Sequence, residues 1–143
     1  LADWLLEQGV THIIGSHPHV IQPMELRTDS ITGAQHAVVY SLGNFISNMS
    51  KVNTDGGLIF TLELEKDTTT STSPQVRVQR CGYNFVWTAR PNFTKEKNYV
   101  LYPTDSTSIS KLPEAALNHL NIFVKNSRKL LHQHNIGIKE NKK

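Results

Sequence analysis

Apolar positions recur with two different periods along the chain, and each change of period marks a predicted element. Residues 1–8 place apolar side chains on one face at helical spacing, and Gly9 follows as a stop. Residues 10–14 predict a short buried strand. The nearly continuous apolar run at residues 36–40 predicts a second strand that is covered on both faces. A helix, a glycine and a strand in this order are typical of the second half of an α/β unit.

The middle of the chain predicts more β structure. Residues 58–65 and 76–80 alternate between apolar and polar side chains. We therefore expect an antiparallel hairpin, whose strands are connected by the Thr/Ser-rich loop at residues 66–74. Further short strands are expected at residues 83–88, where aromatic side chains at every second position predict a core face, and at residues 99–102.

A long amphipathic helix is predicted from about residue 110 to about residue 132, with Pro113 in its first turn. Its apolar stripe consists of Leu117, Leu120, Val124 and Leu131. Gly137 is a predicted breaker, and residues 139–143 predict a frayed basic tail. The expected fold class is α/β of an α+β-like kind, mostly strands with a C-terminal helix. No internal repeat or domain boundary is visible.

The composition excludes only a few classes of function. The net charge of +3 owes much to the lysines at the end of the chain, and no stripe of interleaved aromatic and basic residues predicts nucleic-acid binding. Cys81 is the single cysteine, so no internal disulfide forms. No apolar run reaches membrane-spanning length, and no signal peptide is visible. The chain starts at Leu1 inside a predicted helix, so we expect the natural amino terminus to be missing.

The strongest chemical signal is a pair of imidazoles, His17 and His19, just after the predicted strand and Gly15. Pro18 disfavours the helical region for His17, so we expect an extended, stiff triplet with both rings on one face. Two such rings at the carboxyl end of a strand are well placed to bind a metal. The alternative is that both histidines are merely exposed or hydrogen-bonded for structural reasons.

A second loop, at residues 41–46, follows the second buried strand and has the small polar composition of a site-forming segment. Within it, Ser41 and Asn44 are candidates to order the histidine ligands, although Asn44 is at least as well explained as a left-handed turn residue. The other histidines are interpreted as structural (His12) or as surface residues (His119, His132 and His134).

Two stretches together carry a family resemblance: Gly-Ser-His-Pro-His-Val at residues 15–20 and Val-Tyr-Ser-Leu-Gly-Asn-Phe at residues 39–45. In this order they resemble the carboxyl-terminal half of the bacterial capsule-synthesis (poly-γ-glutamate synthesis, CapA-type) family, which is similar to the calcineurin-like metallophosphoesterases. The link at residues 22–25 and the strand at residues 57–60 fit as well, so the resemblance covers about residues 1–65.

The resemblance implies that residues 1–143 are the carboxyl-terminal portion of a four-layer α/β/β/α sandwich with a site for two divalent metals, either manganese, iron or zinc. His17 and His19 would be the last His-x-His ligands, with Ser41 and Asn44 in the second shell or the substrate loop. The other ligands of that family lie upstream and are absent here. No catalytic residue is therefore assigned, and the fragment alone is expected to be inactive.

Three functions remain open. The first is a metal-dependent hydrolase of phosphoester type in capsule or poly-γ-glutamate synthesis. The second is a non-catalytic assembly or polymer-binding factor in the synthesis and export of that polymer. The third is a β-rich structural domain whose histidine pair is incidental. The resemblance implies an anionic polymer or phosphoester as substrate, membrane-associated capsule machinery as partner, and a location in the cell envelope.

Overall fold

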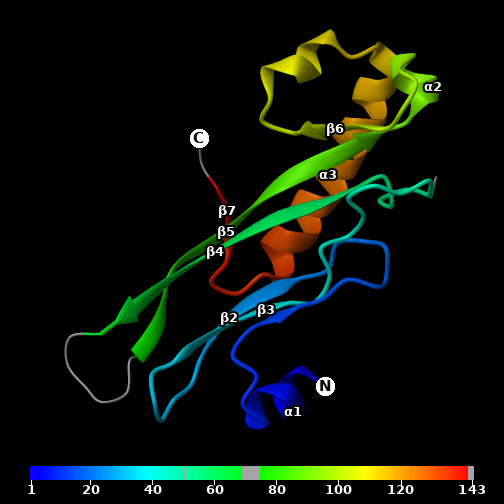
Figure 1. Ribbon diagram of the computed structural model, residues 1–143. Helices are drawn as coiled ribbons and strands as arrows, with labels where there is room; N and C mark the ends of the chain where they lie inside the picture. The colour runs from blue at the N-terminus through cyan, green and yellow to red at the C-terminus, as the bar shows by residue number, and fades with distance from the viewer. Residues whose placement is uncertain (50, 69–74, 142–143) are drawn as a thin grey trace.

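The computed structural model describes residues 1–49, 51–68 and 75–141, and it has a mixed α/β fold that consists mostly of strands (Figure 1). The fold class expected from the sequence is confirmed, and the architecture is consistent with a fragment of an α/β sandwich. The elements in chain order are α1 (Ala2–Glu7), β1 (Ile13–Ile14), β2 (Met24–Thr28), β3 (Gln35–Val39), β4 (Gly56–Asp67), β5 (Gln75–Ala89), α2 (Pro91–Thr94), β6 (Val100–Pro103), the 3-10 turn η1 (Thr107–Lys111), α3 (Glu114–His134) and β7 (Lys139–Glu140).

The first sheet has the order β1-β3-β2, with β1 parallel and β2 antiparallel to β3. Ala37, Val38 and Val39 in β3 are fully buried, so the prediction of a strand covered on both faces is confirmed. The first strand is shorter than expected, because only Ile13 and Ile14 pair with β3, and the expectation that it is buried is wrong, because Ile14 is exposed.

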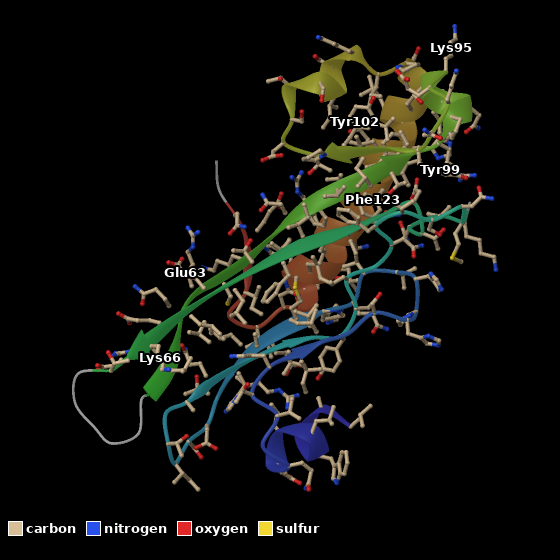
Figure 2. All side chains as sticks on the ribbon, viewed as in Figure 1. Glu63, Lys66, Lys95, Tyr99, Tyr102 and Phe123 are labelled. Carbon is tan, nitrogen blue, oxygen red and sulfur yellow. The ribbon has the colours of Figure 1, made fainter. Side chains whose placement is uncertain are left out.

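The second sheet is a long antiparallel hairpin of β4 and β5, to which β6 and β7 add. Separate strands were expected at residues 76–80 and 83–88, but β5 is one continuous strand. Its Cys81 and Gly82 remain in register with β4, and a bulge at Glu63/Leu64 absorbs the irregularity. Figure 2 shows Glu63 on the part of the hairpin that extends away from α3. Most of the predicted loop, residues 69–74, lies outside the described residues.

Helix α3 packs against the second sheet and supplies much of the core. Leu120, Val124 and Leu131 are buried as predicted, and Leu117 is partly buried. Phe123, labelled in Figure 2, is buried as well, with its ring edge-on to Phe85 at a centroid distance of 6.2 Å. Pro113 is the residue that precedes the first turn. No described helix has both the length and the apolar character that a membrane crossing requires.

The aromatic face predicted within residues 83–88 is confirmed. Tyr83, Phe85 and Trp87 are all buried, and they alternate with residues on the opposite face of β5. Their rings lie in the same core cluster as Met24 and Val39 of the first sheet. One hydrophobic core therefore holds both sheets and α3 together.

The two sheets are also joined through their backbones. At one end, Gly43 bridges to Gly57, and the Leu58 N–H donates to the Leu42 carbonyl at 2.8 Å. At the other end, the segment after α3 contacts both sheets, because Ile136 pairs beside Glu25 of β2 and β7 then pairs with β5.

The prediction of a frayed tail is therefore wrong for residues 139–141. Lys139 and Glu140 pair with β5, and the Asn141 N–H donates to the Tyr83 carbonyl at 2.8 Å. Arg128 also donates two hydrogen bonds to the Glu140 carboxylate, at 2.7 and 2.9 Å. No apolar pattern in the sequence marks this pairing, because backbone hydrogen bonds between strands need no apolar side chains. Residues 142–143 lie outside the described residues.

Candidate metal-ligand site

The candidate site lies where two neighbouring parallel strands end. Because β1 and β3 run in the same direction, the loops that follow them meet at one edge of the sheet. Two backbone hydrogen bonds of Gly15 hold the first loop in place. Its N–H donates to the Val39 carbonyl at 2.7 Å, and its carbonyl accepts from the Leu42 N–H at 3.1 Å. A Cβ at this position would overlap the carbonyl oxygen of Tyr40, so glycine is needed here for close approach.

The prediction that residues 17–19 form an extended triplet is wrong. His19 has a left-handed backbone conformation with φ of 61°, and the chain bends at residues 18–20. Pro18 limits its own φ and the conformation of His17, but it places no limit on His19. Histidine is one of the few non-glycine residues enriched in the left-handed region. His17 and His19 are therefore not alternate residues of one extended segment, whose side chains would share a face.

The bend brings the ring of His19 onto the second loop. Its Nδ1 lies 2.8 Å from Oδ1 of Asn44, whose side chain is buried. The Nδ2 group of Asn44 donates to the Thr54 carbonyl at 2.7 Å, and this bond identifies Oδ1 as the acceptor toward His19. The proton of the neutral imidazole is therefore on Nδ1, and Nε2 keeps its lone pair. His19 thus has one fixed tautomer, and the lone pair of its Nε2 is available to coordinate a metal.

His17 is less defined. Its side chain is exposed, and no hydrogen bond to it is found among the described residues. Within the same residues, no group of three or more His, Cys, Asp or Glu side chains is placed to hold a metal ion. A catalytic zinc normally takes three protein ligands. The chain therefore offers a positioned imidazole at His19 and a second nearby at His17, and a complete metal centre needs further donors.

The structure separates the two candidates in the second loop. Asn44 holds the ring of His19, and its interpretation as a left-handed residue is wrong because Gly43 takes that conformation, with φ of 77°. The fully buried Ser41 accepts a hydrogen bond from the Gly43 N–H at 3.2 Å, so its hydroxyl orders the turn. Among the described hydrogen bonds, none connects Ser41 with His19.

Four further histidines take the roles expected from the sequence. Nδ1 of His12 accepts a hydrogen bond from the Ala37 N–H at 3.1 Å, which is a structural contact. Burial lowers the pKa of His12, and the nearby His36 lowers it further. His119, His132 and His134 are exposed on α3.

Sequence reasoning missed the base of the second loop, which is formed by Thr54 and Asp55. The Thr54 carbonyl holds the Asn44 amide, and the neighbouring Asp55 is buried, with Oδ2 accepting a hydrogen bond from Nε1 of Trp87 at 3.0 Å. A tryptophan predicted to be in the core needs an acceptor for its N–H, and this requirement was the available signal.

The fold and this edge define a mixed α/β protein with a histidine loop and an asparagine loop at the carboxyl ends of the parallel strands β1 and β3. The family model described as bacterial capsule synthesis protein PGA_cap matches residues 1–49, which include both loops. The resemblance is confirmed over those residues and supports a role in capsule synthesis; the match ends before the residue 65 expected from the sequence. No curated protein and no solved structure matches the chain.

Proposed function

We propose that this chain is part of a metal-dependent, metallophosphoesterase-like protein of bacterial capsule or poly-γ-glutamate synthesis, in which His17 and His19 are metal ligands. The observation that carries the proposal is the 2.8 Å contact between His19 Nδ1 and Asn44 Oδ1. Histidines that bind metals almost always donate their other N–H to an oxygen acceptor, which fixes the tautomer and the ring orientation. Asn44 supplies such an acceptor from a buried position.

The residues of this chain would hold and orient the metal rather than perform the reaction. His19 would bind through Nε2 as a neutral imidazole, and Asn44 and Thr54 would keep its ring in place. Imidazole binds zinc and iron better than manganese, but it suits both zinc and iron. These two ligands therefore do not select a single metal. A pair of divalent ions, when bound, supplies Lewis acidity and lowers the pKa of a bound water.

A second candidate is a non-catalytic assembly or polymer-binding factor of capsule synthesis. Among the described residues, no third His, Cys, Asp or Glu side chain joins the two histidines, so these residues by themselves hold no complete catalytic centre. On this hypothesis the loops are retained as a scaffold, and the protein binds the polymer without hydrolysing a bond.

Metal analysis of the whole natural polypeptide tests the proposal. We expect His17→Ala and His19→Ala to lower the bound metal, and the control His132→Ala, which changes an exposed histidine on α3, to leave it unchanged. Unchanged metal content in His19→Ala would overturn the ligand assignment. Hydrolysis of a chromogenic phosphodiester with added manganese then separates the two candidates: activity that requires His19 supports the enzyme, and a metal-loaded but inactive protein supports the binding factor.

A further inference from the structure

Asp55 is a buried residue whose carboxylate is hydrogen-bonded to the hydrophobic core. Its Oδ2 accepts a hydrogen bond from Nε1 of Trp87 at 3.0 Å, and its backbone carbonyl accepts one from the Thr88 N–H at 2.8 Å. Trp87 is fully buried, and its ring lies beside those of Phe93 and Tyr102 at centroid distances of 6.1 and 6.4 Å. A buried carboxylate needs such a bond, and a bond to a charged acceptor is stronger than one to a neutral acceptor. Asp55 is therefore firmly connected to β5.

The residues on both sides of Asp55 hold Asn44. The Thr54 carbonyl, directly before Asp55, accepts a hydrogen bond from Nδ2 of Asn44 at 2.7 Å. The Gly56 carbonyl, directly after Asp55, accepts one from the Asn44 N–H at 3.0 Å. The first bond fixes the side chain of Asn44 and the second fixes its backbone. A shift of residues 54–56 would therefore move Asn44 or break its hydrogen bonds, and Asn44 is the residue that contacts His19.

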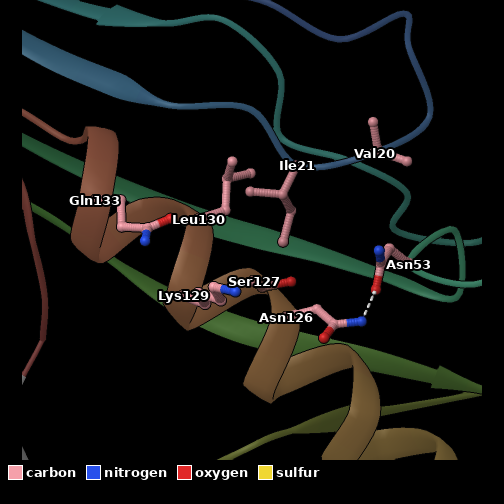
Figure 3. A pocket seen from close by; sticks show the side chains of 8 residues that line it. All are labelled: Val20, Ile21, Asn53, Asn126, Ser127, Lys129, Leu130 and Gln133. Atoms are coloured by element: carbon pink, nitrogen blue, oxygen red, sulfur yellow. Dashed lines mark hydrogen bonds between the residues drawn. The ribbon is translucent and has the colours of Figure 1, made fainter.

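Helix α3 contacts the same segment at the preceding residue, Asn53. Nδ2 of Asn126 donates to Oδ1 of Asn53 at 2.9 Å, as Figure 3 shows. This bond is exposed, so water can replace either partner and its loss costs little. The Trp87 N–H lies in the core, so the loss of Asp55 would leave a buried donor without its acceptor. The buried bond of Asp55 is therefore the stronger restraint on the position of the segment.

We propose that Asp55 is a positioning residue of the candidate metal-ligand site. Its bond with Trp87 fixes residues 54–56, these residues hold Asn44, and Asn44 keeps the proton of His19 on Nδ1. A binding site needs its ligands placed within about 0.5 Å, and this precision requires support from residues that are themselves fixed. The consequence for metal affinity rests on the proposed function, whereas the effect on the tautomer of His19 does not.

The test is ¹⁵N NMR of the histidine rings in the whole natural polypeptide, in EDTA so that no metal takes part. The parent protein should carry the His19 proton on Nδ1. Asp55→Leu removes the acceptor but keeps a side chain of similar size, so residues 54–56 should shift and both tautomers of His19 should appear. Trp87→Phe removes the donor of the same bond and should have the same effect. Asp55→Asn keeps an oxygen acceptor and should keep the parent tautomer.

Two controls separate positioning from general stability. Ile138→Ala opens a cavity where the segment after α3 contacts both sheets, so it should destabilise the fold and leave the tautomer of His19 unchanged. Asn126→Ala removes the exposed bond to Asn53 and should also leave it unchanged. In competition with a chromophoric chelator for zinc, Asp55→Leu should bind about tenfold more weakly than the parent, and both controls should bind like the parent.

The inference would be overturned if His19 kept its proton on Nδ1 in the folded Asp55→Leu and Trp87→Phe proteins. It would also be overturned if Ile138→Ala or Asn126→Ala changed the tautomer equally, or if Asp55→Asn behaved like Asp55→Leu. Circular dichroism identifies the variants that are folded, and Trp87→Phe decides the test if Asp55→Leu is not. A changed tautomer together with unchanged metal content in His19→Ala contradicts the proposed metal site alone. An unchanged tautomer together with metal loss in His19→Ala contradicts this inference alone.

Discussion

Nδ1 of His19 and Oδ1 of Asn44 lie 2.8 Å apart, although 25 positions separate the two residues in the sequence. The contact joins the loop after β1 to the loop after β3, the two strands that run in parallel. Because Asn44 also donates to the Thr54 carbonyl, its amide has one orientation, and the tautomer of His19 follows from it. The metal proposal depends on this chain of two hydrogen bonds.

Replacing Asn44 with leucine should weaken metal binding by about 10-fold to 100-fold, because the ring of His19 would lose the acceptor that orients it. Affinity is measured by competition with a chromophoric chelator for zinc. Asn48→Leu is the control, since Asn48 is an exposed asparagine just after this loop and its described hydrogen bond is with the Tyr99 hydroxyl rather than with His19. Equal metal affinities for Asn44→Leu and the parent protein would show that Asn44 does not orient a ligand.

Replacing Gly57 with alanine should destabilise the protein by roughly 1–3 kcal/mol, because the added Cβ would lie 2.6 Å from the Asn44 carbonyl and 2.7 Å from the Leu42 carbonyl. These atoms form the connection between the two sheets. Gly33→Asn is the control: Gly33 has φ of 71° with open space around it, and asparagine tolerates that conformation. The free energy of unfolding in urea measures both, and a Gly57→Ala protein as stable as the parent contradicts the packing described here.

Truncation after Ile138 should lower the free energy of unfolding by about 2–3 kcal/mol, because it removes the pairing of β7 with β5 and the hydrogen bonds of Asn141. The exposed Arg128–Glu140 pair adds at most about 1 kcal/mol to this loss. Truncation after Asn141 is the control, since every described contact of β7 is kept. If residues 139–141 were frayed, the two truncated proteins would be equally stable. Thermal unfolding of both proteins measures the difference.

Acid should destabilise the fold through His12. Its pKa in the folded state lies below the ordinary value of 6.5, first because of burial and then because of His36. The stabilisation that neutral His12 provides is complete above pH 6.5 and is lost as the pH falls through its folded-state pKa. Protonation of Nδ1 also breaks the hydrogen bond from Ala37.

His12→Asn isolates this effect, because asparagine keeps an acceptor near the position of Nδ1 but does not titrate. Between about pH 7.5 and about pH 5, the parent protein should lose more of its unfolding free energy than the variant, because folding lowers the pKa of His12 and the variant has no titrating group at this position. Urea unfolding at both pH values measures the difference. Parallel losses in the two proteins would rule out His12 as the titrating group.

Much of the fold was predictable because helices and strands with a buried face have apolar residues at regular spacing in the sequence. The apolar run of β3, the alternation in β4 and the stripe of α3 each specified an element and its buried face. The pairing of residues 139–141 shows no such apolar pattern, because backbone hydrogen bonds can form with almost any side chains.

The candidate site was predictable in its residues but not in its geometry. The positions of His17 and His19 after β1, and of Asn44 after β3, follow from the order of the motifs. The bend at His19 and its contact with Asn44 depend on how two distant loops pack, which no local pattern encodes. The role of Thr54 is carried by its backbone carbonyl, so its side chain gave no signal.

¹⁵N NMR of the histidine rings in the whole natural polypeptide, with zinc titrated in, tests whether His19 is a metal ligand with a fixed tautomer. We expect His19 to carry its proton on Nδ1 before zinc is added, and zinc then to shift the Nε2 resonance while Nδ1 keeps its proton. A His19 ring protonated on Nε2, or one whose resonances do not change with zinc, would show that His19 is not the ligand proposed here.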